Sequence, residues 1–277
     1  MILGKIFKTK RPFVGMVHFP PLLGYGDFPG LKTCFQKSLK DAKTLEKAGV
    51  DGIIFENNYD IPHKEFVGPE TTASMTFLVS EISKEIKIPF GINVLWNDFK
   101  ASLSIAKITG ASFVRIPVFV DDVETQYGKI FARPKEILNF RKKIEAEEIA
   151  LFVDVQVKHA KMLKKRKIEE SVKEAIKYKA DAIIVTGEWT GKAPSLEKLK
   201  RAKIAAKEKV PVLIGSGINL KNLEKLLPFA DGVIVGTALK EGKISKKLVN
   251  LKPWQARISF EKTKKLVDKF RELKSQE

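Results

Sequence analysis

Short apolar runs rich in β-branched residues alternate with longer amphipathic segments along the 277-residue sequence, and this alternation constrains the fold most. Such a pattern is typical of parallel strands that are joined by crossover helices. Eight of the short runs have the length and composition of strands. They are residues 12–18, 50–56, 89–95, 111–118, 149–155, 181–186, 210–214 and 231–235.

The segments between these runs place apolar residues at three- and four-residue spacing, which predicts amphipathic helices. The clearest are 35–48, 70–86, 99–109, 168–178, 196–208 and 220–227, with a terminal helix near 259–273. No linker rich in Gly, Pro or Ser divides the chain. We therefore predict a single (β/α)₈ TIM barrel over residues 1–277, whose C-terminal helix within 253–277 closes the outer ring. A doubly wound open sheet is the alternative architecture.

Two glycine-containing turns follow the seventh and eighth predicted strands. Glycine lets the backbone approach an anion closely and leaves amide N–H groups free to donate. Barrels of this class often bind phosphate at these two turns, and a short helix at 237–240 would direct its positive end to the same anion. The predicted phosphate-binding residues are Gly215, Ser216, Gly217, Gly236 and Thr237. The alternative is that the glycines only form tight turns.

Ionisable side chains also gather at the carboxyl ends of the predicted strands, where barrels carry their chemistry. The candidate catalytic residues are Asp154, Lys158 and His159 after the fifth strand, Glu56 at the second and His18 at the first. Burial and close charge pairs move pKa values toward neutrality, so such a set can supply a general acid and a general base. The alternative is an Asp154–Lys158 ion pair that only orders its loop.

Other polar residues of these loops are predicted to position a substrate. They are Asn57, Asn93, Asn97, Asp98, Arg115, Thr186 and Gly187. Segment 186–191 is either a mobile loop that covers a ligand or a surface loop with an aromatic residue packed on the rim. The sequence implies no organic cofactor. A divalent metal is not favoured, because neither HxH nor HExxH spacing occurs.

The formal net charge is +18, from 51 Lys and Arg against 33 Asp and Glu. The charge attracts polyanions, but the basic residues are spread over most predicted helices, without the aromatic-interleaved stripe of a nucleic-acid surface. We expect weak, non-specific contact with polyanions or an anionic membrane surface and no specific nucleic-acid partner. The sequence leaves open whether the protein forms a homo-oligomer. Because no run reaches about 20 apolar residues and residues 1–11 lack a signal-peptide core, we expect a cytoplasmic protein, with peripheral membrane contact as the alternative.

Seven motifs occur in one order along the chain: GMVHFPPLLG from Gly15, GVDGIIFEN from Gly49, GINVLWND from Gly91, DVQVKH from Asp154, VTGEWTG from Val185, GSGIN from Gly215 and DGVIVGTALK from Asp231. Together they closely resemble the BtpA family, from about residue 4 to residue 260. The resemblance implies a ribulose-phosphate-binding type of barrel. The family takes its name from a role in photosystem I biogenesis, in which the founding member associates peripherally with membranes. Pro117 departs from the family-like pattern, where Asn is expected.

Two hypotheses of different classes follow. The first is an enzyme that binds a small phosphorylated metabolite, phosphosugar or nucleotide-like, and performs acid–base chemistry of an isomerase, lyase or transferase type. The second is a non-catalytic assembly factor whose basic surface and terminal helix engage a membrane or a protein complex. That helix carries Phe260, Leu266, Val267, Phe270 and Leu273 among lysines. The same apolar residues would also suit the eighth outer helix of a barrel.

Overall fold

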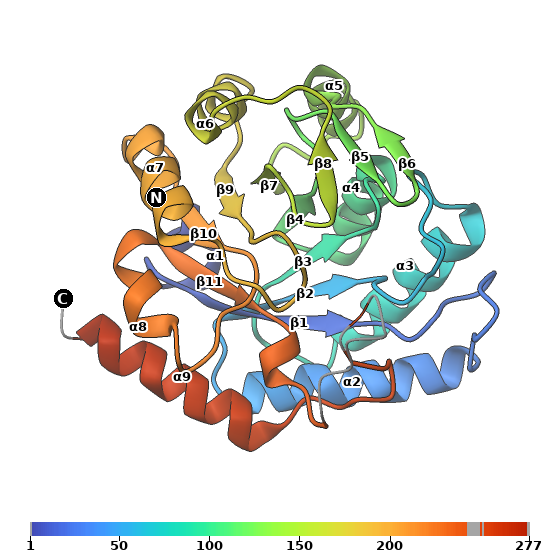
Figure 1. The fold of residues 1–277 in the computed structure, drawn as a ribbon. Helices are drawn as coiled ribbons and strands as arrows, with labels where there is room; N and C mark the ends of the chain where they lie inside the picture. Colours follow the sequence, from blue (N-terminus) through green and yellow to red (C-terminus); the bar gives the residue numbers. More distant parts are fainter. Residues whose placement is uncertain (1, 243–249, 251, 276–277) are drawn as a thin grey trace.

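Eight parallel strands close into a barrel in the computed structural model, which describes residues 2–242, 250 and 252–275 (Figure 1). Each barrel strand pairs with the next one along the chain, and the last pairs with the first, with Val235 beside Gly15. The strands are β1 (Phe13–His18), β2 (Gly52–Glu56), β3 (Phe90–Asn93), β4 (Phe113–Ile116), β7 (Ala150–Val155), β9 (Ala182–Val185), β10 (Val212–Ile214) and β11 (Gly232–Val235). The predicted (β/α)₈ TIM barrel is confirmed, and the open-sheet alternative is wrong.

Proline residues explain why three strands begin later than predicted. Pro12, Pro89 and Pro211 immediately precede β1, β3 and β10. Proline has no N–H group, so it cannot donate to a strand ladder. Each proline carbonyl still accepts a hydrogen bond from a neighbouring strand; that of Pro12, for example, accepts from the Val233 amide at 3.0 Å.

Helices surround the barrel and bury their apolar faces against the strands (Figure 1). They are α2 (Leu31–Lys47), α3 (Pro69–Ser83), α4 (Phe99–Thr109), α5 (Pro134–Lys143), α6 (Ile168–Lys177), α7 (Leu196–Ala206), α8 (Leu223–Leu226) and α9 (Phe260–Ser275). The helix predicted at 220–227 is broken: α8 passes into a 3₁₀ turn, η1 (Leu227–Phe229), at Pro228. Proline has no N–H group to donate to the carbonyl four residues earlier, so the α-helical hydrogen bonds stop at Leu227 and α8 stays short.

A small antiparallel sheet outside the barrel was not predicted. It consists of β5 (Val123–Thr125), β6 (Gly128–Ile130) and β8 (Ala160–Met162), in the order β6-β5-β8. The first two strands follow β4 and the third follows β7, so the sheet belongs to the loops at the carboxyl ends of the barrel strands. Runs of three residues are too short for a period-2 pattern to reveal them.

The opposite end of the barrel is closed by a short N-terminal helix, α1 (Ile2–Phe7), which was also not predicted. The Phe7 ring packs edge-on against Phe113, with 5.5 Å between centroids. A Cβ atom on Gly52 would lie 2.6 Å from the Phe7 ring, so glycine at that position makes room for it. The amino end of the barrel is therefore packed with apolar side chains, which leaves the carboxyl end as the place for a site.

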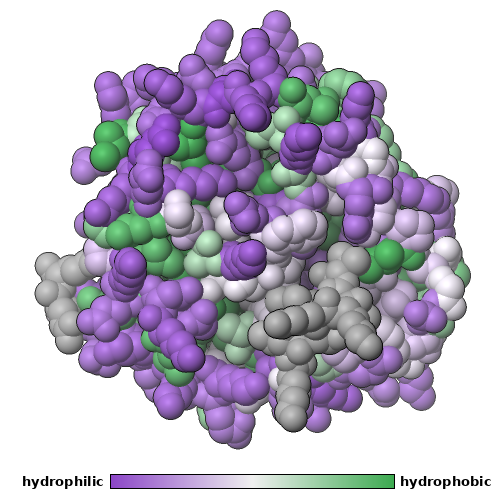
Figure 2. Space-filling view, viewed as in Figure 1, coloured by the Kyte–Doolittle hydropathy of each residue, from purple (hydrophilic) through white to green (hydrophobic). Residues whose placement is uncertain are grey.

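The C-terminal helix α9 lies alongside α2 (Figure 1). Its Phe270 ring meets Phe13 of β1 edge-on at 5.5 Å, and Leu266 and Val267 are buried beside it. The helix begins at Phe260 rather than at residue 253, and residues 276–277 of the predicted segment lie outside the described residues. None of the helices in the described part of the chain is long and apolar enough to span a membrane. The face visible in Figure 2 is largely hydrophilic, with hydrophobic residues in small separate patches.

Candidate functional site at the carboxyl end of the barrel

The turns after β10 and β11 line one cavity of about 670 Å³ at the carboxyl end of the barrel. Gly215, Ser216 and Gly217 come from the first turn, and Gly236 and Thr237 from the second, where a 3₁₀ turn, η2 (Thr237–Leu239), follows β11. Gly217 has a φ of +71°, and a Cβ atom there would lie 2.0 Å from the Ala193 amide nitrogen. No other residue type fits this position without moving the loop after β9. The fold thus brings both predicted phosphate-binding segments to the same space.

The Ser216 side chain holds two loops together. Its hydroxyl accepts a hydrogen bond from the Gly187 amide at 3.0 Å and donates one to the Lys192 carbonyl at 2.9 Å. The Thr186 hydroxyl, in turn, accepts from the Lys158 amide at 2.9 Å. These side chains are used within the protein, so Ser216 can offer a ligand its backbone more readily than its hydroxyl.

The cavity has a strongly basic lining. Its described lining residues include seven lysines and arginines but a single carboxylate. The basic residues are Arg115, Lys158, Lys221, Lys240, Lys252, Lys262 and Lys265, and the carboxylate is Glu56. Positive charge concentrated in a cleft attracts anions and raises their local concentration. The field of the cavity therefore favours an anionic ligand.

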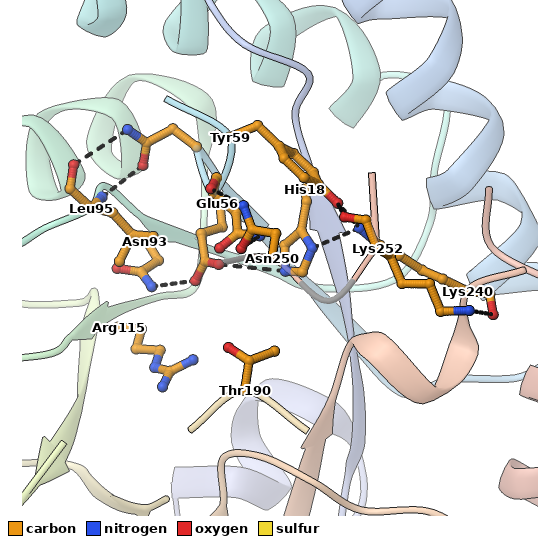
Figure 3. Close-up of polar contacts among 12 residues, drawn as sticks. His18, Glu56, Tyr59, Asn93, Leu95, Arg115, Thr190, Lys240, Asn250 and Lys252 are labelled. Carbon is orange, nitrogen blue, oxygen red and sulfur yellow. Dashed lines mark hydrogen bonds and ion pairs between the residues drawn. The ribbon is translucent and has the colours of Figure 1, made fainter. Parts of the chain in front are cut away.

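A connected polar cluster extends from β1 and β2 to the second glycine turn (Figure 3). Nε2 of His18 lies 3.4 Å from Oε1 of Glu56, and the other Glu56 oxygen accepts from Asn93 at 2.6 Å. On its other side, Nδ1 of His18 is 2.9 Å from Nζ of Lys240, which also donates to the Tyr59 hydroxyl at 2.9 Å. His18 and Glu56 were predicted as catalytic candidates, whereas Lys240 and Tyr59 were not.

The protonation of this cluster is set mainly by burial. Lys240 is only 2% exposed. Burial, together with the nearby charge of Lys37, lowers the pKa of Lys240 to about 7. Burial and the charge of Lys240 also lower the pKa of His18 well below its usual value. The site therefore holds a neutral imidazole next to an amine that can gain or lose a proton near neutral pH, as acid–base chemistry requires.

Arg115 and Asp154 form a buried, two-point ion pair. Nε and Nη2 of Arg115 donate to the two Asp154 oxygens at 2.9 and 2.8 Å. The predicted alternative, an Asp154–Lys158 pair, is therefore wrong. Lys158 lines the cavity, and burial and the charge of Arg115 lower the pKa of its amine.

His159 points to the loop after β9 rather than into the main cavity. Its Nε2 lies 2.7 Å from the Thr190 hydroxyl and accepts from the Thr190 amide at 3.1 Å. Its ring meets Trp189 edge-on at 4.7 Å, and burial lowers the pKa of His159 to about 4. Asp154 thus pairs with Arg115, whereas the Lys158 amine, at 3.4 Å, and His159 both contact the Thr190 hydroxyl.

Three predicted substrate-positioning residues hold backbone segments instead of lining the cavity. Asn57 accepts from the Leu95 amide at 2.7 Å, and Asn97 accepts from the Val118 amide at 2.8 Å. Asp98 caps α4 by accepting from the Ala101 amide at 2.8 Å. These contacts fix the loops after β2 and β3, so the three residues shape the site from outside it. Among the described residues, no group of three or more His, Cys, Asp or Glu side chains could hold a metal ion.

Comparison with known proteins gives both a family and a fold. The sequence profile described as the BtpA family matches residues 9–261. An uncharacterised protein of Archaeoglobus fulgidus is 39% identical over 84% of this chain and 93% of its own length. The photosystem I biogenesis protein BtpA of Synechocystis is 38% identical over 87% of this chain and 84% of its own length. Thiamine phosphate pyrophosphorylase from Pyrococcus furiosus superposes with a TM-score of 0.58 at 15% identity, covering 95% of this chain and 96% of that one.

Proposed function

The chain belongs to the BtpA family, and we propose that it is an enzyme that binds a small phosphorylated metabolite and moves a proton on it. The observation that carries the proposal is the pairing of two glycine turns with a basic lining in one 670 Å³ cavity. The phosphate group would lie against the backbone at Gly215–Gly217 and Gly236–Thr237. The name of thiamine phosphate pyrophosphorylase includes a phosphorylated compound. At 15% identity, however, the likeness of that enzyme to this chain concerns the fold alone.

Proton transfer is assigned to the cluster around His18. Glu56 is the only carboxylate among the described residues that line the cavity, and His18 contacts Glu56 through Nε2 and Lys240 through Nδ1. A carboxylate next to a neutral imidazole and an amine whose pKa is about 7 can take a proton from one atom of a substrate and return it to another. Arg115 and Lys158, which also line the cavity, would stabilise the negative charge that develops. Asp154 then acts as a positioning residue that orients Arg115.

Titration calorimetry with inorganic phosphate and glycerol 3-phosphate tests the binding step. We expect both to bind, and a ligand at 100 times its Kd should stabilise the protein by about 2.7 kcal/mol. Proton transfer is tested by incubating sugar phosphates with the protein in deuterated water and following C–H exchange by NMR. His18→Gln should abolish the exchange and leave phosphate affinity within about twofold of the wild type. If no phosphate ester binds in calorimetry and none shows C–H exchange by NMR, the proposal is refuted.

The name of the Synechocystis relative favours a second candidate, a non-catalytic assembly factor at a membrane or protein complex. Its predicted contact element was the apolar face of the terminal helix. In the structure, Leu266, Val267 and Phe270 of that face are buried. This role would therefore need another surface or a displaced α9, and a protein that binds phosphate esters without any proton exchange would support it over the enzyme.

A further inference from the structure

A second, smaller cavity of about 60 Å³ adjoins the main one at the carboxyl ends of β3 and β4. Six lining residues are common to both cavities, so a ligand can extend from one into the other. They are Glu56, Asn58, Arg115, Lys158, Thr190 and Asn250. The smaller cavity adds His63 from the loop after β2, Asn93 from β3 and Tyr127 from the turn between β5 and β6.

Three buried polar atoms at this cavity have no hydrogen-bond partner among the described residues. They are Oδ1 of Asn93, Nδ1 of His63 and the hydroxyl oxygen of Tyr127. Asn93 is 1% exposed and His63 8% exposed. The orientation of Asn93 is set by its amide nitrogen, which donates to Glu56 at 2.6 Å. Leaving a buried polar group unsatisfied destabilises a protein, so three such atoms beside one cavity indicate a missing partner.

The chemistry of the missing partner follows from the atoms of Asn93 and His63 and from the apolar walls of the cavity. Asn93 Oδ1 needs a hydrogen-bond donor, whereas Nδ1 of His63 donates or accepts according to its tautomer. Burial lowers the pKa of His63 to about 4, so its ring is neutral and offers no charge to an anion. A hydroxyl group both donates and accepts, and it can bond to either atom. Trp96 and Val157 supply apolar walls for the carbon atoms that carry such hydroxyls.

The size of the cavity limits which part of a ligand can enter it. A volume of about 60 Å³ holds a few water-sized groups, which suits the hydroxyl-bearing end of a sugar better than a nucleobase. We propose that this cavity is a hydroxyl subsite and that the ligand is a phosphorylated sugar or polyol, with its hydroxyl end between Asn93 and His63. This inference rests on the proposed function and names its substrate class. The His63 ring is held for this role by the edge-on contact of Tyr127 at 5.3 Å.

The test compares ligands of increasing length by titration calorimetry at one salt concentration. The probes are inorganic phosphate, glycerol 3-phosphate, 2-deoxyribose 5-phosphate, ribose 5-phosphate and AMP. We expect ribose 5-phosphate to bind at least about tenfold more tightly than glycerol 3-phosphate, because it adds hydroxyls that satisfy buried atoms. AMP carries a base at C1 of the ribose in place of a hydroxyl, so it should not show this increase in affinity over glycerol 3-phosphate.

Two variants assign the gain to the subsite. His63→Phe removes the ring nitrogens with little change of shape, and Asn93→Ala removes the amide. Each should reduce the advantage of ribose 5-phosphate by about tenfold and leave the affinity for inorganic phosphate unchanged. Asn139→Ala, at an exposed position of α5, is the matched control and should change neither affinity.

The outcomes separate the subsite from the phosphate site. If inorganic phosphate binds but longer sugars gain nothing, water fills the small cavity and the hydroxyl subsite is refuted, while the proposed function stands. A gain that survives in both variants also refutes the subsite. If inorganic phosphate and all esters fail to bind, the proposed function fails and the subsite fails with it.

Discussion

Nζ of Lys240 lies 2.9 Å from Nδ1 of His18. Because the pKa of His18 is lowered by burial and by Lys240 itself, the imidazole is neutral and accepts the lysine hydrogen at Nδ1. Its own hydrogen must then be on Nε2, 3.4 Å from Glu56. Lys240 thus fixes the tautomer of His18 and orients its N–H toward the carboxylate, in the way that a buried partner orients a catalytic histidine.

The buried amine of Lys240 gives folding stability a distinct pH dependence. Its pKa is about 7 in the folded protein, against 10.5 as the ordinary value, so the unfolded chain binds more protons between pH 7 and 10.5. The free energy of unfolding should therefore rise through this window by up to about 1.4 kcal/mol per pH unit. Below pH 7 the contribution of Lys240 should not change with pH. Lys240→Met should remove this term, which urea unfolding at pH 6, 7, 8 and 9 would measure.

The control for this experiment is Lys264→Met, because Lys264 is on the exposed face of α9. Its curve of stability against pH should parallel that of the wild type. If Lys240→Met also gives a parallel curve, the amine is protonated throughout and cannot exchange a proton with His18 near neutral pH.

Gly217→Ala should weaken phosphate binding. The substitution places a side chain at a φ of +71° and 2.0 Å from the Ala193 amide, so the turn or the loop after β9 must move. We expect at least a tenfold loss of affinity for inorganic phosphate by calorimetry, with about 1–2 kcal/mol of added backbone strain. Gly110→Ala is the control: its φ is +77°, but open space surrounds it, so stability falls without a change in phosphate affinity. Unchanged affinity in Gly217→Ala would mean that the glycine only forms a turn.

The sequence predicted the barrel because its strands are buried and rich in β-branched residues, which produces runs that stand out from amphipathic helices. The helix α1 and the strand β5 were missed because they are short and their identity depends on tertiary contacts. Leu3 and Phe7, for example, pack into the barrel end, a relationship that no local pattern encodes. Local propensity gives way to such contacts in short elements.

The positions of the candidate site residues could be predicted where they depend only on the ends of the strands. His18 and Glu56 each end a strand, and the glycine turns follow the seventh and eighth strands, so barrel topology brings them together. Lys240 ends the motif DGVIVGTALK, but its lowered pKa comes from burial beside Tyr59. The sequence alone does not reveal that burial. The role of Asp154 depends on Arg115, a partner 39 positions away.

The ion pair between Arg115 and Asp154 should be essential for stability. Both groups are buried, and removal of one partner leaves the other charge without compensation. Asp154→Asn should therefore lower the free energy of unfolding in urea by about 3–5 kcal/mol, and Arg115→Met by a similar amount. The double variant Arg115→Met/Asp154→Leu should lose much less than the sum of the two. Additive losses would instead show that the two side chains act independently.

The last prediction concerns Phe270, which decides between two uses of the terminal helix. Because its ring is 1% exposed and packs on Phe13, Phe270→Ala should destabilise the protein by about 3–5 kcal/mol in urea unfolding. Glu272→Ala, on the exposed face of the same helix, should cost less than about 0.5 kcal/mol. Both variants should sediment with anionic phosphatidylserine vesicles to the same extent as the wild type at equal salt. If Phe270→Ala keeps full stability and loses vesicle binding, α9 leaves the barrel to contact membranes, and the assembly-factor role gains over the enzyme.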